Sequence, residues 1–200
     1  MYRYIKVKNN KKLLNDIFRF RCKILCDELK YFDKKRYPDG LERDEYDKYS
    51  EHYAVLDEKG EIAATVRLIH HSPIGYPTEN HMRVFENIKK SLKRDKLGEI
   101  SRIFISKQYR NLKDSRKIIE KLISMIYIDL KNNDIEYTFG ALEKSFLRLL
   151  KIYNINYEII GDLQEYGGVR YPCLLYTSSL EKDKPQVVEC YKIWKVGNGH

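Results

Sequence analysis

The chain has 200 residues, of which 42% are hydrophobic, 34% charged and 12% aromatic, and its formal net charge is +9 at pH 7. This length suits one domain with a sizeable core, and the hydrophobic content excludes a chain that is disordered throughout. The sequence has no apolar run of about 18 residues and no clean apolar segment near its start, so we expect no membrane span, no secretory signal and a cytoplasmic location.

The positive charge predicts attraction to an acidic partner, such as nucleic acid, an anionic membrane surface, an acidic protein or a phosphate-bearing substrate. Nucleic acid is disfavoured, because the basic residues are interleaved with 29 acids and gather in no recognisable motif. Peripheral contact with a membrane stays open. The four cysteines, at positions 22, 26, 173 and 190, form neither a CxxC motif nor a cysteine-histidine cluster, so no metal site is predicted.

Hydrophobic periodicity predicts a strand, a helix, a loop and a hairpin over the first 69 residues. Residues 2–7 alternate as a strand, and apolar positions from 13 to 29 recur at helical spacing. The stretch around Pro38-Asp39-Gly40 is crowded with acids and turn residues, which is typical of an ordered loop over a site. Residues 52–56 and 62–69 then alternate as the two strands of a hairpin.

The remaining pattern predicts a loop over residues 70–80, a short basic helix over 85–96 and a strand over 97–109. Residues 112–130 give the most regular helix, and a strand, a helix and two strands follow at 135–141, 142–153, 155–160 and 168–177. From residue 178 the chain turns polar, although Val187, Val188, Ile193 and Trp194 could dock it. We therefore expect one domain over residues 1–180 and a tail over 181–200 whose docking stays open.

The strand over residues 97–109, LGEISRIFISKQY, carries an acid and a base among apolar positions. Strict alternation separates Glu99, Ser101, Ile103 and Ile105 from Ile100, Arg102 and Phe104. Each face would then hold one charge beside large apolar side chains, and such a charge needs a partner or a functional role. The alternative is an edge strand whose charges reach solvent or pair across the sheet.

Two further arginines, Arg21 and Arg67, also fall among apolar positions. A buried guanidinium favours carboxylate partners, and the one dense acidic run is Glu42-x-Asp44-x-x-Asp47. We expect these acids to pair with Arg21, Arg67 and Arg102 in one buried charge network beside an active cleft. The alternative is a solvated acidic loop, whereas a calcium loop is disfavoured because the alternating oxygen ligands and the closing Glu are missing.

The element order resembles the GNAT acyltransferase fold. This resemblance implies an α/β (α+β) domain whose central mixed, mostly antiparallel sheet splays in the middle, with helices on both faces. The order and approximate spacing of Arg21, Glu42-x-Asp44-x-x-Asp47, Arg67-Leu68 and Glu99-Ile-Ser101-Arg102 resemble acyl-homoserine-lactone (autoinducer) synthases and N-acyl amino acid synthases. A longer match, to acyltransferases associated with PEP-CTERM/exosortase systems, includes residues 37–47, His52, 65–69, 99–102, Ile105, Ser106, 147–150, Gly161, Tyr166, Gly167 and 170–172.

The resemblance implies transfer of a fatty acyl group from a thioester to a small amine such as an amino acid, with a lactone made from S-adenosylmethionine as the alternative. The attacking amine must lose a proton, and Glu99 is the first candidate base, with His52 as the second and Ser101 beside them as a further catalytic residue. Backbone N–H groups would stabilise the oxyanion. The predicted substrate-binding residues are Arg21, Tyr31, Arg67, Arg102, Phe104 and Ile105.

The resemblance implies no tightly bound cofactor, because the acyl-phosphopantetheine thioester is a co-substrate. Residues 108–113, QYRNLK, lack the glycines that let a backbone approach the pyrophosphate of coenzyme A, so an acyl carrier protein is the preferred donor. The expected docking face for that acidic protein comprises Lys89, Lys90, Lys93, Arg94, Lys107 and Arg110. Adenosylmethionine is in doubt, because Leu25 and Tyr31 stand where the lactone synthases carry an aromatic pair. Outside enzymes, the alternative is an inactive, partner-binding GNAT-like module, and the oligomeric state stays open.

Overall fold

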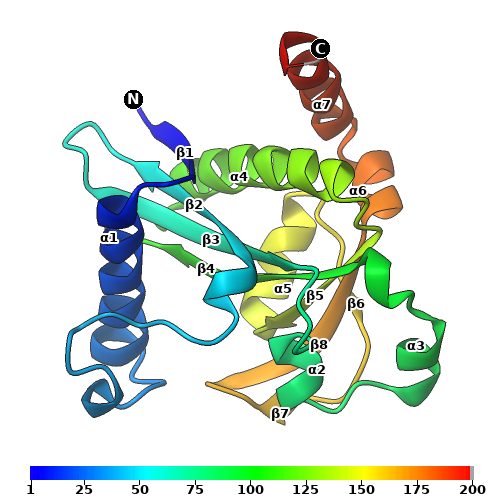
Figure 1. The fold of residues 1–200 in the computed structure, drawn as a ribbon, viewed down its shortest axis with the longest axis horizontal. Helices are drawn as coiled ribbons and strands as arrows, with labels where there is room; N and C mark the ends of the chain where they lie inside the picture. Colours follow the sequence, from blue (N-terminus) through cyan, green and yellow to red (C-terminus); the bar gives the residue numbers. More distant parts are fainter. Residues whose placement is uncertain (199–200) are drawn as a thin grey trace.

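The computed structural model describes residues 1–198 as one central sheet covered by helices (Figure 1). The strands are β1 Arg3–Val7, β2 Ser50–Leu56, β3 Ile62–His70, β4 Leu97–Ile105, β5 Tyr137–Leu142, β6 Glu158–Ile159, β7 Gln164–Glu165 and β8 Val169–Tyr176. The helices are α1 Lys11–Cys22, α2 Pro77–His81, α3 Glu86–Ser91, α4 Leu112–Asn132, α5 Lys144–Ile152, α6 Thr177–Asp183 and α7 Pro185–Asn198. The π-helix Lys23–Glu28 continues α1 over six residues.

The sheet runs in the order β1-β2-β3-β4-β5-β8-β6, and β7 pairs with β8. Strand β2 shows why helices lie on both faces, because its side chains alternate between two cores. Tyr53 and Val55 pack in the core that includes α4, whereas Ala54 and Leu56 pack against Ile17 and Phe18 of α1. The mixed, mostly antiparallel GNAT-like sheet expected from the sequence is confirmed.

The two middle strands diverge and create the space for a site. Strands β4 and β5 are parallel and pair only between residues 97–99 and 137–139. Beyond Glu99, β4 keeps its pairing with β3, and β5 keeps its pairing with β8. The sheet therefore splits into two halves that are joined at one end and open at the other.

A β-bulge in β4 overturns the strict alternation expected for this strand. Thr65 pairs with Phe104 and Arg67 with Ser101, so Val66 alone faces two residues, one of which is Arg102 with φ of +52°. After the bulge Ile103 and Ile105 join Ile100 in the core beneath α4. The Arg102 side chain instead shares the face of Ser101, so the two charges of the strand lie on one face and not on opposite ones.

Five predicted elements differ from the structure. The strand expected over residues 97–109 ends at Ile105 and is followed by a 3-10 turn at Lys107–Tyr109. The helix expected over residues 85–96 is the short α3 followed by a 3-10 turn at Arg94–Lys96. The loop expected over 70–80 contains α2, which begins at Pro77 because proline suits the first helical position. The strand expected over 155–160 shrinks to the two residues of β6, and the helical pattern up to residue 29 ends in the π-helix.

The C-terminal segment is helical up to residue 198. Val187 of α7 is fully buried against the core beneath α4, whereas Ile193 is 73% exposed near the far end of the helix. Figure 1 shows α7 projecting from the body beyond this contact. Within residues 1–198, no helix has the length and apolar content needed to cross a membrane.

Candidate active site

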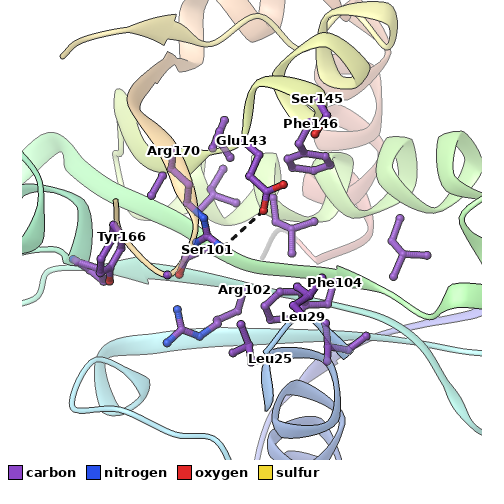
Figure 2. Close-up of a pocket in the computed structure, with 18 of the residues that line it drawn as sticks. Leu25, Leu29, Ser101, Arg102, Phe104, Glu143, Ser145, Phe146, Tyr166 and Arg170 are labelled. Atoms are coloured by element: carbon purple, nitrogen blue, oxygen red, sulfur yellow. Dashed lines mark ion pairs between the residues drawn. The ribbon is translucent and has the colours of Figure 1, made fainter. Parts of the chain in front are cut away.

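The splay between β4 and β5 holds a cavity of about 480 Å³. Its floor is the bulged part of β4, and the π-helix after α1 and the start of α5 supply opposite walls (Figure 2). The apolar lining includes Ile24, Leu25, Leu29, Phe32, Ile103, Phe104, Ile105, Phe146 and Leu149. The polar lining includes Glu99, Ser101, Arg102, Arg110, Glu143, Tyr166 and Arg170. An elongated apolar molecule with one polar reacting end suits such a lining.

Behind this cavity the predicted acids and arginines lie together as one network. Arg21 donates from Nε to Glu42 and from Nη1 to Asp47 Oδ1 at 2.8 Å. Its side chain and that of Glu42 are almost completely buried. Burial alone would raise the pKa of Glu42, but the guanidiniums of Arg102 and Arg21 outweigh burial and hold this pKa at about 2.

The other two arginines join the network from the sheet. Arg67 of β3 donates from Nη1 to Asp44 at 2.6 Å and to Asp47 at 2.8 Å, and from Nε to Ser101 Oγ at 3.0 Å. Arg102 donates from Nη2 to Glu42 at 2.8 Å and to Asp44 at 3.0 Å. The acidic loop is thereby tied to α1, β3 and β4, which fixes the side of the cavity formed by the bulge.

Glu99 is the buried acid that faces the cavity itself. Its side chain is held by α2, because the backbone N–H of Thr78 donates to Glu99 Oε2 at 2.8 Å. The residue is 1% exposed, and burial raises the pKa of Glu99 to about 7 in spite of the Thr78 N–H and the guanidinium of Arg67. A carboxyl group with a pKa near neutrality is suited to accept and return a proton.

The other two predicted catalytic residues lie at different depths. Ser101 lines the cavity and accepts a hydrogen bond from Arg67. His52 is buried between Phe18 and the network, where its Nε2 lies 3.4 Å from the main-chain oxygen of Asp47, and it does not line the cavity. Direct contact between His52 and a substrate in this cavity is therefore not supported.

Replacing His52 with glutamine is expected to lower the melting temperature and to leave the turnover close to that of the wild type. Burial, opposed by Asp47, lowers the pKa of His52 to about 4, so the ring is neutral at pH 7 and carries no charge into the network. Glutamine keeps a hydrogen-bonding group but loses the edge-on contact with Phe18. Thermal unfolding beside steady-state kinetics checks this, and a loss of turnover above about 10²-fold with an unchanged melting temperature would restore His52 as a base.

Comparison of the chain with known protein families agrees with this geometry. The family described as "Acetyltransferase (GNAT) domain" matches residues 20–119, half of the chain, and this segment contains the acidic loop, the three arginines and Glu99. The chain belongs to the GNAT acetyltransferase family. It is an acyltransferase by that membership, and no curated protein sequence matches it.

Three solved structures share the fold at low identity. TofI has a TM-score of 0.71 at 14% identity, covering 94% of this chain and 99% of TofI. BjaI, titled a CoA-dependent acyl-homoserine lactone synthase, has a TM-score of 0.71 at 16% identity over 94% of this chain and 89% of BjaI. FeeM, titled an N-acyl amino acid synthase from uncultured soil microbes, has a TM-score of 0.63 at 13% identity over 94% of this chain and 99% of FeeM.

The predicted substrate-binding residues of this GNAT acyltransferase have three different positions relative to the cavity. Arg102, Phe104 and Ile105 line the cavity. Arg21 and Arg67 are completely buried, pair with the acidic loop and do not line the cavity, although Arg67 Nη2 has no hydrogen-bond partner within residues 1–198. Tyr31 does not line the cavity, but its hydroxyl donates to Glu143, which does.

The predicted docking face of this GNAT acyltransferase is not one patch. Lys89, Lys90, Lys93 and Arg94 precede β4, and Lys107 and Arg110 follow it. A strand of nine residues spans about 30 Å, so the two groups lie at opposite ends of β4, as Figure 1 shows for α3 and the tip of that strand. Arg94 is also occupied by Glu79. Of the six residues only Arg110 lines the cavity, and its guanidinium is paired with Glu28.

Sequence reasoning missed several residues of the site. Thr78 gives no signal apart from the preceding Pro77, which marks a helix start. Glu143 stands near the start of a predicted helix, and its direction into the cavity depends on the splay. Only the longer resemblance points to Tyr166 and Arg170. Tyr166 follows the two-residue β7, which carries too little periodicity to place it, whereas Arg170 lies in the predicted last strand, whose pattern does not show which of its residues face a cavity.

Proposed function

We propose that this GNAT acyltransferase moves a fatty acyl group from an acyl thioester to the amine of a small acceptor such as an amino acid. The observation that carries the proposal is the combination of an apolar cavity with one buried acid, Glu99, whose pKa is about 7. The apolar side chains suit an acyl chain, and the acid suits a proton transfer beside it.

In the proposed reaction the neutral amine attacks the thioester carbonyl. The new C–N bond forms, Glu99 takes the proton released by the nitrogen directly or through water, and the C–S bond breaks with the electron pair going to sulfur. Glu99 then gives that proton to the departing thiolate, which yields the free thiol of the carrier and restores the ionised acid. Charge develops on the carbonyl oxygen, and N–H donors must meet it. Beyond Glu99 no described strand pairs with β4 on its β5 side, so main-chain groups of the bulged segment are available there.

The start of α4 supports a carrier protein over coenzyme A. The Asn111 side chain already accepts from the backbone N–H of Asp114 at 2.9 Å. The carboxylate of Asp114 adds negative charge to the same helical turn. A pyrophosphate would meet an occupied N–H group and a like charge, whereas an acidic carrier protein could contact the exposed Lys107 outside this turn.

Activity with an acyl carrier protein is expected to fall as salt rises. Attraction between Lys107 and an acidic carrier is screened beyond about 8 Å at physiological ionic strength, so the KM for the carrier should increase with salt and in Lys107→Glu. The control is Lys90→Glu, at the other end of β4, which should leave that KM unchanged. Amine-dependent release of thiol measures both, and equal KM values for the carrier and for acyl coenzyme A at all salt concentrations would contradict the preference.

A lactone synthase is the second candidate, because BjaI, titled a CoA-dependent acyl-homoserine lactone synthase, shares the fold at a higher TM-score than FeeM. This candidate would have to bind adenosylmethionine with Leu25 and Tyr31 at the positions where the lactone synthases carry an aromatic pair. Supplying adenosylmethionine together with a pool of amino acids to the purified enzyme separates the two candidates, since one yields a lactone and the other an N-acyl amino acid.

A further inference from the structure

Arg170 differs from every arginine of the charge network. Each of the other three has carboxylate oxygens within 3.2 Å. The nearest carboxylate oxygen to Arg170 is Glu143 Oε1, at 3.8 Å, which is beyond hydrogen-bond distance (Figure 2). Its Nε is buried and has no hydrogen-bond partner within residues 1–198. Arg170 therefore lines the cavity with a guanidinium that has no hydrogen-bonded carboxylate and has an Nε donor left for a ligand.

The surroundings hold this guanidinium in place without neutralising it. The guanidinium lies 5.3 Å from the ring centre of Tyr31, whose hydroxyl donates to Glu143 at 2.9 Å. Gly168, with φ of +103°, packs against the hydroxyl end of the Tyr31 ring, where an added Cβ atom would lie 2.9 Å from Tyr31 Cζ. Burial lowers the pKa of Arg170 although Glu143 opposes this shift. A charge kept in these surroundings gains most from an incoming anion.

We propose that Arg170 binds the carboxylate of the acceptor and so makes amino acids, and not simple amines, the substrate class. This inference rests on the proposed transfer to an amine. Glu99 and Arg170 line the same cavity, so one end of an amino acid can give its proton to the acid while the other end pairs with the guanidinium. A planar carboxylate can accept two hydrogen bonds from the guanidinium, including one from the free Nε.

The test compares two acceptor pools with an acyl-loaded carrier protein as donor. One pool contains the proteinogenic amino acids and the other contains their α-amides, which lack the negative charge. The wild-type enzyme is expected to favour the amino acids, and Arg170→Gln to reduce this preference about 10–100-fold, as the loss of a charged hydrogen bond predicts. The KM for the acyl donor should stay the same. Arg148→Gln, an exposed change on α5, is the control and should match the wild type.

Arg170→Lys guards against a folding defect in the glutamine variant, and it should keep part of the preference because it keeps the charge. Equal use of both pools by the wild type overturns the inference and leaves the proposed function standing. A raised KM for the donor in Arg170→Gln, with the preference intact, also overturns it and assigns the cation to the phosphate of the carrier. Absence of acyl transfer to every amine in both pools overturns the proposed function itself.

Discussion

Glu99→Gln is expected to lower turnover by about 10²–10⁴-fold, the usual contribution of a general base, without loss of the fold. Glutamine has the size of glutamate, and its side-chain oxygen can still accept from the Thr78 N–H that now meets Glu99 at 2.8 Å. Only the ability to take a proton is removed. Turnover measured beside the melting temperature decides this, and wild-type turnover in the variant would end the assignment.

The pH dependence gives an independent check on Glu99. Since the acid must be ionised to act as a base, wild-type turnover should rise as the pH rises through about 7, and this rise should vanish in the variant. The folded-state pKa lies above the ordinary 4.5, so the stability from this group is full at low pH and is lost as the pH rises through 7. At pH 8 the glutamine variant should therefore be at least as stable as the wild type. Lower stability in the variant at that pH would mean that Glu99 mainly supports the fold.

Arg21→Met is expected to destabilise the protein by about 3–5 kcal/mol, because it leaves two buried carboxylates with one neutralising cation fewer. Glu42 would keep only Arg102, and Asp47 would keep only Arg67. Methionine preserves much of the length and apolar contact of the arginine stem, so the change isolates the charge. Chemical denaturation at pH 7 measures the effect.

The matched control is Arg19→Met, two residues away on the same helix. Arg19 pairs with Asp16 on the surface and is mostly exposed, so its loss should change the free energy of unfolding by at most about 1 kcal/mol. Similar small effects in both variants would show that the buried network contributes little.

Acid titration should report on the same network. Glu42 has a folded pKa of about 2 against an ordinary 4.5, so its contribution is present above pH 4.5 and is lost as the pH falls towards 2. In Arg21→Met this dependence should be shallower, because one of the two cations that lower the pKa is gone. An identical acid-unfolding curve for the variant and the wild type would contradict the assigned role of Arg21.

The sequence could predict those features that depend on local pattern and charge balance. Arginines at apolar positions and a single acidic run leave few ways to pair, so the partners of Arg21, Arg67 and Arg102 could be anticipated. The bulge could not, because a period of two contains no sign of one extra residue. Missing it put Arg102 and Ile103 on the wrong faces of β4.

Features set by long-range geometry also escaped prediction. The six basic residues of the expected docking face look like two nearby clusters in the sequence, yet β4 extends between them. The N–H of Thr78 reaches Glu99 only because α2 folds over the start of β4. Arg170 is identified as a site residue only in the structure, by its buried Nε, which has no hydrogen-bond partner within residues 1–198.

The most direct test of the account is mass spectrometry of lipid extracts from cells that express either the wild-type chain or Glu99→Gln. The account predicts a new N-acylated amine in cells with the wild-type protein and at least about 10²-fold less in cells with equal amounts of the variant. The absence of any N-acylated product from the wild type, or equal amounts from both proteins, would contradict acyl transfer to an amine with Glu99 as the base.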